Sequence, residues 1–207
     1  NEDRAGFLAG ALAASMSETG TIGQVLGTNL VPPVQAFGSG FDLGAKHINP
    51  DIEILKTYHP GAIEVAFGDP EWGATTSRQA MDNGADVIFA AGGATGNGGL
   101  IEIASEAEAG SRVFCIGVDL DQWYSVPEAQ PCLITSAEKH MVQGVSDLIV
   151  QAAAGEMPTG NVYGTVGLAP YHDFDSQISD EIKATIDEIA AALNDGSMVT
   201  GHEFGME

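Results

Sequence analysis

Residues 84–99 read GADVIFAAGGATGNGG, and this stretch decides the fold. Its apolar run, residues 86–91, has the length of a buried strand, and the glycine-rich run 92–99 leads straight into a helical pattern at residues 100–109. A buried strand, a connection and a helix are the repeating unit of a parallel sheet covered by helices. The stretch therefore predicts an α/β protein, in which ligands bind where the strands end.

The same alternation of apolar runs and helical patterns extends in both directions. Further strands are expected at residues 22–26, 52–58, 113–118 and 132–135, and further helices at residues 4–16, 34–48, 69–83, 137–154 and 179–193. Five alternations favour a doubly wound parallel sheet. Residues 158–167 are expected to be extended, and residues 168–174 to form an edge strand. Small residues in the first helix, including Gly6 and Gly10, predict close packing against another element.

Composition excludes several classes of function. The 207 residues are 44% apolar and 17% charged, which suffices to bury a core in one large domain or two small lobes. Disorder is excluded as the main state. Lys and Arg total 7 against 29 Asp and Glu, and the net charge of −22 repels phosphate backbones and anionic lipid headgroups. The sequence thus predicts no nucleic-acid partner.

Neither the cysteines nor the apolar runs assign a compartment. Cys115 and Cys132 are too few for a disulfide scaffold and are interpreted as a buried pair of free thiols. No run approaches the ~18 uninterrupted apolar residues of a membrane span, so none is predicted. The residues from Asn1 onward lack the features of a secretion signal, so we expect any signal to have been removed or not included.

The glycine-rich run 92–99 has two interpretations. Its spacing is not that of a P-loop, no Lys-Ser or Lys-Thr pair follows it, and its glycines do not match the dinucleotide-binding pattern. It is therefore either a tight turn or a cradle whose backbone groups hold a neutral polar ligand.

Charged residues follow two of the predicted strands. Asp119 and Asp121 come after strand 113–118, where a carboxylate could accept hydrogen bonds from the vicinal hydroxyls of a sugar. Either Asp could instead cap a helix, or the pair could hold Mg²⁺ in a phosphotransferase. Lys139 is expected near a helix start, facing an anionic or hydroxylated group or forming a salt bridge with a nearby carboxylate.

Aromatic residues are the remaining candidates. Phe67 precedes Gly-Asp-Pro and is expected at a strand end, where it could stack on a planar base or plug the core beneath a loop. Trp72 and Trp123 are open to the same two interpretations. The five histidines lack metal-ligand spacing, there is no Cys-x-x-Cys pair, and Ser136 lacks a glycine elbow. The sequence predicts no catalytic residue, metal or cofactor, and hence no enzyme.

Seven short motifs together resemble one family. They are AGFLAG at residues 5–10, FGSGFDLGAK at 37–46, FGDP at 67–70, GADVIF at 84–89, the glycine run at 92–98, IGVDLDQ at 116–122, and Thr135-Ser136 with Lys139. In order and spacing, from about residue 5 to residue 168, they resemble the basic membrane protein (BMP) family, the PnrA-like purine-nucleoside receptors of ABC transporters.

The resemblance implies a type I periplasmic-binding-protein fold, with two α/β lobes and a ligand cleft between them. Residues 1–133 and 159–200 would form the C-terminal ligand-binding lobe. Residues 134–158 would cross to an N-terminal lobe. By this resemblance, the rest of that lobe, which carries an Asp/Asn-rich first loop and an aromatic that stacks on the base, is expected to be absent from these residues.

The resemblance also implies a site and a function. Phe67 would stack on the base, Gly93 would contact the nucleoside through its backbone, Asp119 would take the ribose hydroxyls, and Lys139 would lie near the ribose. The protein would be a monomeric extracytoplasmic lipoprotein that delivers a purine nucleoside to an ABC permease. A free sugar or other small polar solute is an alternative ligand, and a metal-dependent phosphotransferase built on Asp119 and Asp121 is a further alternative.

Overall fold

The computed structural model describes residues 1–203, and its centre is a six-stranded sheet. The strands lie in the order β2, β1, β3, β4, β5, β6, with β6 antiparallel to β5 and all other pairs parallel. Their bounds are Thr21–Leu26 for β1, Glu53–Tyr58 for β2, Val87–Ala91 for β3, Phe114–Asp119 for β4, Leu133–Lys139 for β5 and Val166–Leu168 for β6.

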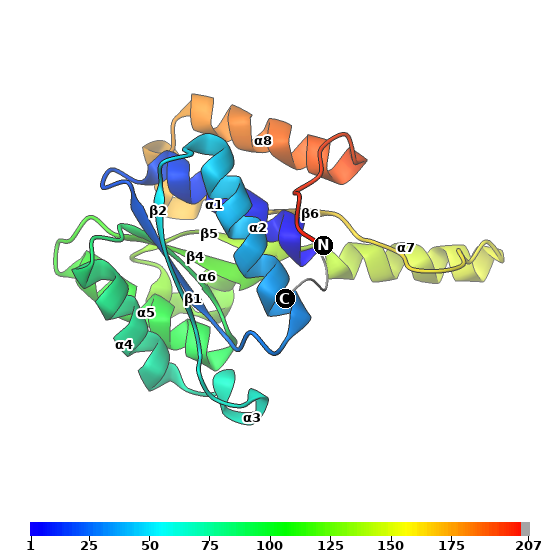
Figure 1. Ribbon diagram of the computed structural model, residues 1–207. Helices are drawn as coiled ribbons and strands as arrows, with labels where there is room; N and C mark the ends of the chain where they lie inside the picture. The colour runs from blue at the N-terminus through cyan, green and yellow to red at the C-terminus, as the bar shows by residue number, and fades with distance from the viewer. Residues whose placement is uncertain (204–207) are drawn as a thin grey trace.

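Helices cover both faces of the sheet, as Figure 1 shows. One face carries α1 (Glu2–Met16), α2 (Pro32–Ile48) and α8 (Asp180–Asp195), and the other carries α4 (Pro70–Asp82) and α5 (Ala94–Glu108). The short elements α3 (Ile63–Ala66), α6 (Gln122–Ser125), η1 (Pro127–Ala129) and η2 (His172–Gln177) lie in the connections, and α7 (Met141–Ala154) leaves the body. The predicted doubly wound α/β architecture is confirmed.

The sheet is buried between two apolar clusters, one on each face. Strand β3 is buried along its whole length, and the Phe89 ring stacks on Phe41 of α2 with ring centroids 5.4 Å apart. Continuous apolar runs are expected for strands covered on both sides, because neither face meets water. The central strands therefore hold their carboxyl ends rigidly in place.

Glycines let α1 and α2 approach each other closely. A Cβ atom on Gly6 or Gly10 would collide with the carbonyl groups of Phe37 and Phe41 in α2. The close packing that the small residues of the first helix predicted is confirmed.

The glycine-rich run 92–99 is not the loop that the sequence predicted. Only its first two residues connect β3 to α5, which begins at Ala94. A Cβ atom on Gly98 would collide with the backbone of Pro70, the first residue of α4. These glycines therefore permit helix packing, and only Gly93, with φ +58°, needs a left-handed backbone.

Strand β5 is longer than predicted, and the helix expected from residue 137 starts only at Met141. Residues 137 and 138 pair with β4, and residues 137–139 pair with β6 on the other side. This pairing outweighs the helix propensity of Ala, Glu and Lys. The edge strand predicted at residues 168–174 was wrong, because β6 spans Val166–Leu168 and residues 172–177 form η2. The strand ends two residues before Pro170, which cannot donate to a ladder.

Cys115 and Cys132 form a disulfide, so their interpretation as free thiols was wrong. Cys115 lies in β4 and Cys132 just before β5, and the Cys115 N–H donates to the Cys132 carbonyl at 2.7 Å. The two residues are 17 positions apart in sequence, and the pairing of β4 with β5 brings their Cα atoms to 5.2 Å. Only the tertiary structure could reveal this proximity.

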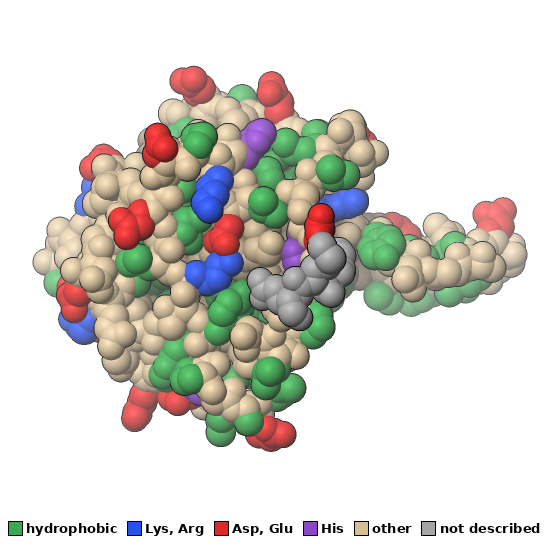
Figure 2. All heavy atoms as spheres, in the orientation of Figure 1, with side chains coloured by type: hydrophobic (Ala, Val, Ile, Leu, Met, Phe, Trp, Pro, Cys, Tyr) green, Lys and Arg blue, Asp and Glu red, His purple; other side chains and the backbone are tan. Residues whose placement is uncertain are grey.

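Helix α7 projects from the body (Figure 1) and buries none of its residues. Figure 2 shows hydrophobic side chains along this projecting segment. The exposed apolar residues of α7 are Met141, Val142, Val145, Ile149 and Val150. Residues 134–139 lie in the sheet, so the projecting segment starts after Lys139.

Within residues 1–203, no helix combines the length and the apolar character that crossing a membrane requires.

Candidate functional site

The four residues predicted to bind ligand lie along the edge of the sheet that is formed by the carboxyl ends of its parallel strands. Asp119 is the last residue of β4 and Lys139 the last residue of β5, while Phe67 and Gly93 lie beside the ends of β1 and β3. These four strands are parallel neighbours, so their carboxyl ends form a row. Neighbouring strands are about 4.8 Å apart, so the row from β1 to β5 spans roughly 14 Å.

Phe67 reaches this edge by a different route from the one predicted. It does not end a strand but follows the short helix α3 in the connection between β2 and α4. Its ring lies against Gly27, just after β1, where an added Cβ would come within 2.6 Å of it. Its carbonyl accepts the Ala94 N–H at 3.0 Å, beside the exposed Gly93. The ring is partly exposed and also packs against the apolar core, so both interpretations of Phe67 stay open.

A buried histidine anchors the connection that carries Phe67. The ring of His59 is 6% exposed, its Nδ1 accepts the Gly61 N–H at 3.0 Å, and its Nε2 lies 3.4 Å from Asp69 Oδ2. The Trp72 N–H and then His59 hold the pKa of Asp69 below its ordinary value. Trp72 packs edge-on against His59, so it supports this connection from beneath.

Asp119 has an unusual backbone conformation. Its φ of +70° is in the left-handed region, and the Leu120 N–H donates to the Val118 carbonyl across it at 2.9 Å. Such a three-residue turn is rare and strained, and strained non-glycine residues concentrate at functional sites. The Gln122 side chain fixes the turn, because its Oε1 accepts the Val118 N–H at 2.8 Å. The turn directs a carboxylate that is 48% exposed toward the sheet edge.

Lys139 pairs with two carboxylates. Its Nζ lies 2.8 Å from Asp119 Oδ1 and 3.2 Å from Glu2 Oε1. Burial lowers the pKa of Lys139, but the hydrogen bonds and charges of Asp119 and Glu2 outweigh burial and raise this pKa above its ordinary value. Lys139 ends a strand, so the prediction of a lysine at a helix start was wrong, whereas the predicted salt bridge is present.

Asp121 plays the structural role that the sequence left open for it. It caps α6 by accepting the Trp123 N–H at 3.1 Å, and its Oδ2 lies 2.9 Å from His172 Nε2. The Trp123 ring stacks on His172, with ring centroids 4.5 Å apart.

Burial, and then the negative charge of Asp121, raises the pKa of nearby Glu138, while His140 opposes this increase.

The structure does not support a metal site on Asp119 and Asp121. Asp121 is committed to its cap and to His172, and Asp119 to Lys139. In the part of the chain that the structure describes, no group of three or more His, Cys, Asp or Glu side chains could hold a metal ion.

A hollow of about 430 Å³ lies on the other side of Lys139, between α7 and the returning chain. Its walls include Val145 and Leu148 of α7 and Val162 and Tyr163 of the returning segment. Phe67, Gly93 and Asp119 do not line it.

Sequence reasoning missed three residues that shape the site. Glu2 pairs with Lys139, and the ring of Phe37 lies 5.3 Å from the Lys139 Nζ. Gln122 holds the turn at Asp119 with its Oε1, and its Nε2 donates to Asn97 at 2.9 Å. Gln122 stands next to the Asp-x-Asp motif and could have been noticed there. Glu2 is 137 residues from Lys139, and no local pattern connects them.

Comparisons with known proteins assign the chain to a family. Residues 1–170 match the Bmp family, described as ABC transporter substrate-binding protein PnrA-like. The CD4+ T-cell-stimulating antigen of Listeria monocytogenes is 32% identical over 93% of this chain and 54% of its own length. Basic membrane protein A1 of Borrelia garinii is 41% identical over 64% of this chain and 36% of its own length. The chain thus spans about half the length, or less, of these curated relatives.

A solved structure places the fold. An ABC transporter solute-binding protein of Aeropyrum pernix superposes with a TM-score of 0.76 at 24% identity, covering 98% of this chain and 65% of the other. Structures of this class have the type I periplasmic-binding fold, which agrees with the doubly wound sheet described above. The chain therefore belongs to the Bmp family of PnrA-like ABC-transporter substrate-binding proteins.

Proposed function

We propose that this chain supplies one half of a receptor site for a neutral purine nucleoside, captured for import by an ABC transporter. The observation that carries the proposal is the row of strand ends that brings Phe67, Gly93, Asp119 and Lys139 to one edge of the sheet. Phe67 would stack on the base, with Gly93 exposing its backbone beside it. Asp119 and Lys139, one to two strands away, would bind the ribose.

The chemistry of the pair suits vicinal hydroxyl groups. A carboxylate accepts two hydrogen bonds from adjacent hydroxyls, and an ammonium donates to a hydroxyl oxygen. Asp119 and Lys139 largely neutralise each other, since their charged atoms are 2.8 Å apart. A net charge of −22 further disfavours a phosphorylated ligand, so the proposal is a nucleoside and not a nucleotide.

We further propose that α7 packs against a second lobe. An apolar helix face that packs against nothing is unusual in water, because helices are stabilised mainly by such packing. Val142, Val145 and Ile149 are 76%, 56% and 65% exposed. In this proposal residues 1–133 and 159–200 belong to the ligand-binding lobe. Of residues 134–158, those up to Lys139 complete β5 in the sheet, and the rest cross toward the second lobe. The ligand would lie in the cleft between the lobes.

The remaining proposals concern location and partners. A buried disulfide is typical of proteins that fold in an oxidising compartment, which supports an extracytoplasmic location. We propose that the receptor is monomeric, is attached to the membrane by a lipid, and delivers its ligand to an ABC permease.

Isothermal titration calorimetry of the full-length gene product with inosine, guanosine, adenosine and ribose tests the ligand class. Tight binding of one or more purine nucleosides, with much weaker binding of ribose, is the expected result. Ribose or another free sugar that binds as tightly as inosine would instead identify a sugar receptor. Indifference to all four compounds would reject the proposal.

A further inference from the structure

The ammonium group of Lys139 has more contacts than a simple ion pair with Asp119. Three elements far apart in sequence converge on its ammonium group: Asp119 at the end of β4, Glu2 at the start of α1, and the ring of Phe37 in α2. A lysine side chain is flexible and loses rotamer freedom when it is held. Contacts from three directions fix the ammonium group in one place.

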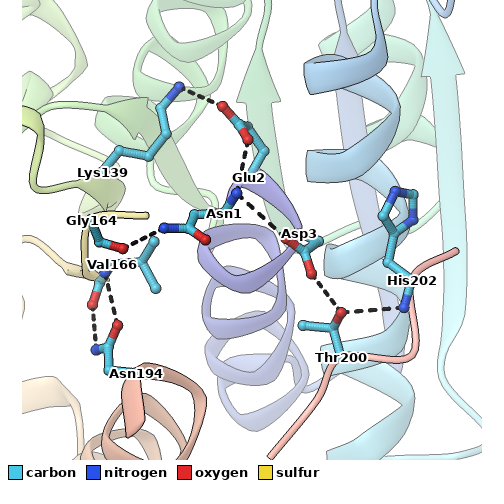
Figure 3. A network of polar contacts seen from close by, with 9 residues as sticks. All are labelled: Asn1, Glu2, Asp3, Lys139, Gly164, Val166, Asn194, Thr200 and His202. Atoms are coloured by element: carbon cyan, nitrogen blue, oxygen red, sulfur yellow. Dashed lines mark hydrogen bonds and ion pairs between the residues drawn. The ribbon is translucent and has the colours of Figure 1, made fainter. Parts of the chain in front are cut away.

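Figure 3 shows how Glu2 takes part. Its Oε1 accepts from Lys139 Nζ at 3.2 Å. The neighbouring Asn1 side chain donates to the Gly164 carbonyl on the returning chain. Burial raises the pKa of Glu2, whereas its own backbone N–H and the hydrogen bond and charge of Lys139 lower it.

The three charged side chains differ in exposure. Asp119 is 48% exposed, whereas Lys139 is 20% and Glu2 24% exposed. Asp119 is therefore the group that a ligand would meet first. If a ligand hydroxyl engages the Asp119 carboxylate, Glu2 still compensates the charge of the Lys139 ammonium group, because Glu2 Oε1 remains 3.2 Å from Lys139 Nζ.

We propose that Glu2 is a positioning residue of the ligand site: its carboxylate holds the Lys139 ammonium beside Asp119 and leaves Asp119 able to accept hydrogen bonds from a ligand. The affinity consequence rests on the proposed function, whereas the hold on Lys139 does not. Glu2 need not touch the ligand.

A purely structural role for Glu2 makes a different prediction. An acidic residue in the first turn of a helix stabilises that helix through its dipole, wherever its side chain points. Asp3 lies in the same turn and carries the same charge, but its Oδ2 accepts from Thr200 Oγ1 at 2.6 Å and does not face Lys139. Asp3→Asn is therefore the matched control for Glu2→Gln.

The first readout needs no ligand. The chain has four lysines, Lys46, Lys56, Lys139 and Lys183, so the pKa of each side chain can be followed separately by NMR of lysine-labelled protein. Glu2→Gln is expected to shift the pKa of Lys139 downward and leave that of Lys183 unchanged, whereas Asp3→Asn leaves both unchanged. An unchanged Lys139 pKa in Glu2→Gln, or an equal shift in both variants, would overturn the proposal.

The second readout is inosine affinity of the full-length gene product, measured by calorimetry. Glu2→Gln is expected to weaken binding roughly three- to tenfold, as for removal of a partly exposed charged contact, while Asp3→Asn binds like the wild type. Equal affinity of Glu2→Gln and wild type would overturn the ligand part of the inference. Wild-type protein that binds no nucleoside would refute the proposed function, and the Lys139 titration would then decide the role of Glu2 alone. If Glu2→Gln fails to fold, Glu2→Asp, with its shorter carboxylate, provides both readouts.

Discussion

Asp119 combines a strained backbone with an exposed carboxylate. A glycine substitution removes both, and we expect it to change ligand affinity but not stability. Asp119→Gly should relieve about 1 kcal/mol or more of left-handed strain and lose a half-exposed ion pair worth about 0 to 1 kcal/mol. Its free energy of unfolding, measured by urea denaturation, should therefore be close to that of the wild type. Its inosine affinity should fall by about 2 to 4 kcal/mol, because hydroxyl partners lose their acceptor. A variant that binds inosine normally would remove Asp119 from the site.

Tyr171 should make the fold sensitive to alkali. Burial, and then the charges of Asp187 and Asp175, raise the pKa of Tyr171 to about 12. The unfolded chain releases this proton near pH 10, so stability is lost as the pH rises from about 10 toward 12.

Tyr171→Phe should reduce that loss in urea unfolding measured across this pH range. Tyr124→Phe is the control, because Tyr124 is 77% exposed. Equal alkaline sensitivity of Tyr171→Phe and wild type would show that another group is responsible. Lys139, whose raised pKa also favours the folded state below its titration, would be the next candidate.

At the scale of elements, the close contact of α1 with α2 depends on glycine. Gly10→Ala places a methyl group against the carbonyl of Phe41 and should cost roughly 1 to 3 kcal/mol of unfolding free energy, as overpacking does. Gly144→Ala in α7 makes only an ordinary van der Waals contact, with Gly164 Cα at 3.9 Å, and should stabilise its helix by up to about 1 kcal/mol. Thermal unfolding of both variants checks the contrast, and similar melting temperatures would refute it.

The disulfide joins β4 to the start of β5 and should stabilise the sheet next to the site. Reduction should lower the unfolding free energy by about 2 to 4 kcal/mol. Urea unfolding with and without a reductant measures this difference. A Cys115→Ala, Cys132→Ala double variant should be insensitive to reductant, and a wild type that is equally insensitive would mean that the thiols are not bonded.

The order and type of the main elements could be predicted from apolar periodicity, because β1, β3 and β4 are short, largely apolar runs, and glycine follows β1 and β3 directly. Local pattern failed where tertiary contacts decide. The glycines of 92–99 resemble a loop, but packing against Pro70 makes them helical. Residues 137–139 have helix propensity, but pairing with β4 and β6 keeps them extended.

The candidate site was predictable only in part, for the same reason. Asp119 and Lys139 each follow a recognisable strand, so their meeting at one edge follows from parallel pairing. Phe67 was predicted to end a strand. It lies at the carboxyl ends of the strands, but it follows the short helix α3. Glu2 could not be predicted, because its partner lies 137 residues away.

At the scale of the whole molecule, the exposed face of α7 leads to a prediction that compares this chain with the full-length gene product. Val145→Lys should leave the unfolding free energy of this chain unchanged, because Val145 is 56% exposed here. In the full-length gene product, if α7 packs on a second lobe, the same change should cost roughly 1 to 3 kcal/mol by burying an unpaired charge. Equal stability of wild type and variant in both contexts would contradict the proposed packing of α7.

The central claim is that a flat, uncharged ligand is held between an aromatic ring and an acid at neighbouring strand ends. A crystal structure of the full-length gene product with inosine tests it most directly. The account predicts the base lying flat on the Phe67 ring and the ribose hydroxyls within hydrogen-bond distance of Asp119. Inosine bound elsewhere, for example in the hollow beside α7, with Phe67 and Asp119 untouched, would contradict it.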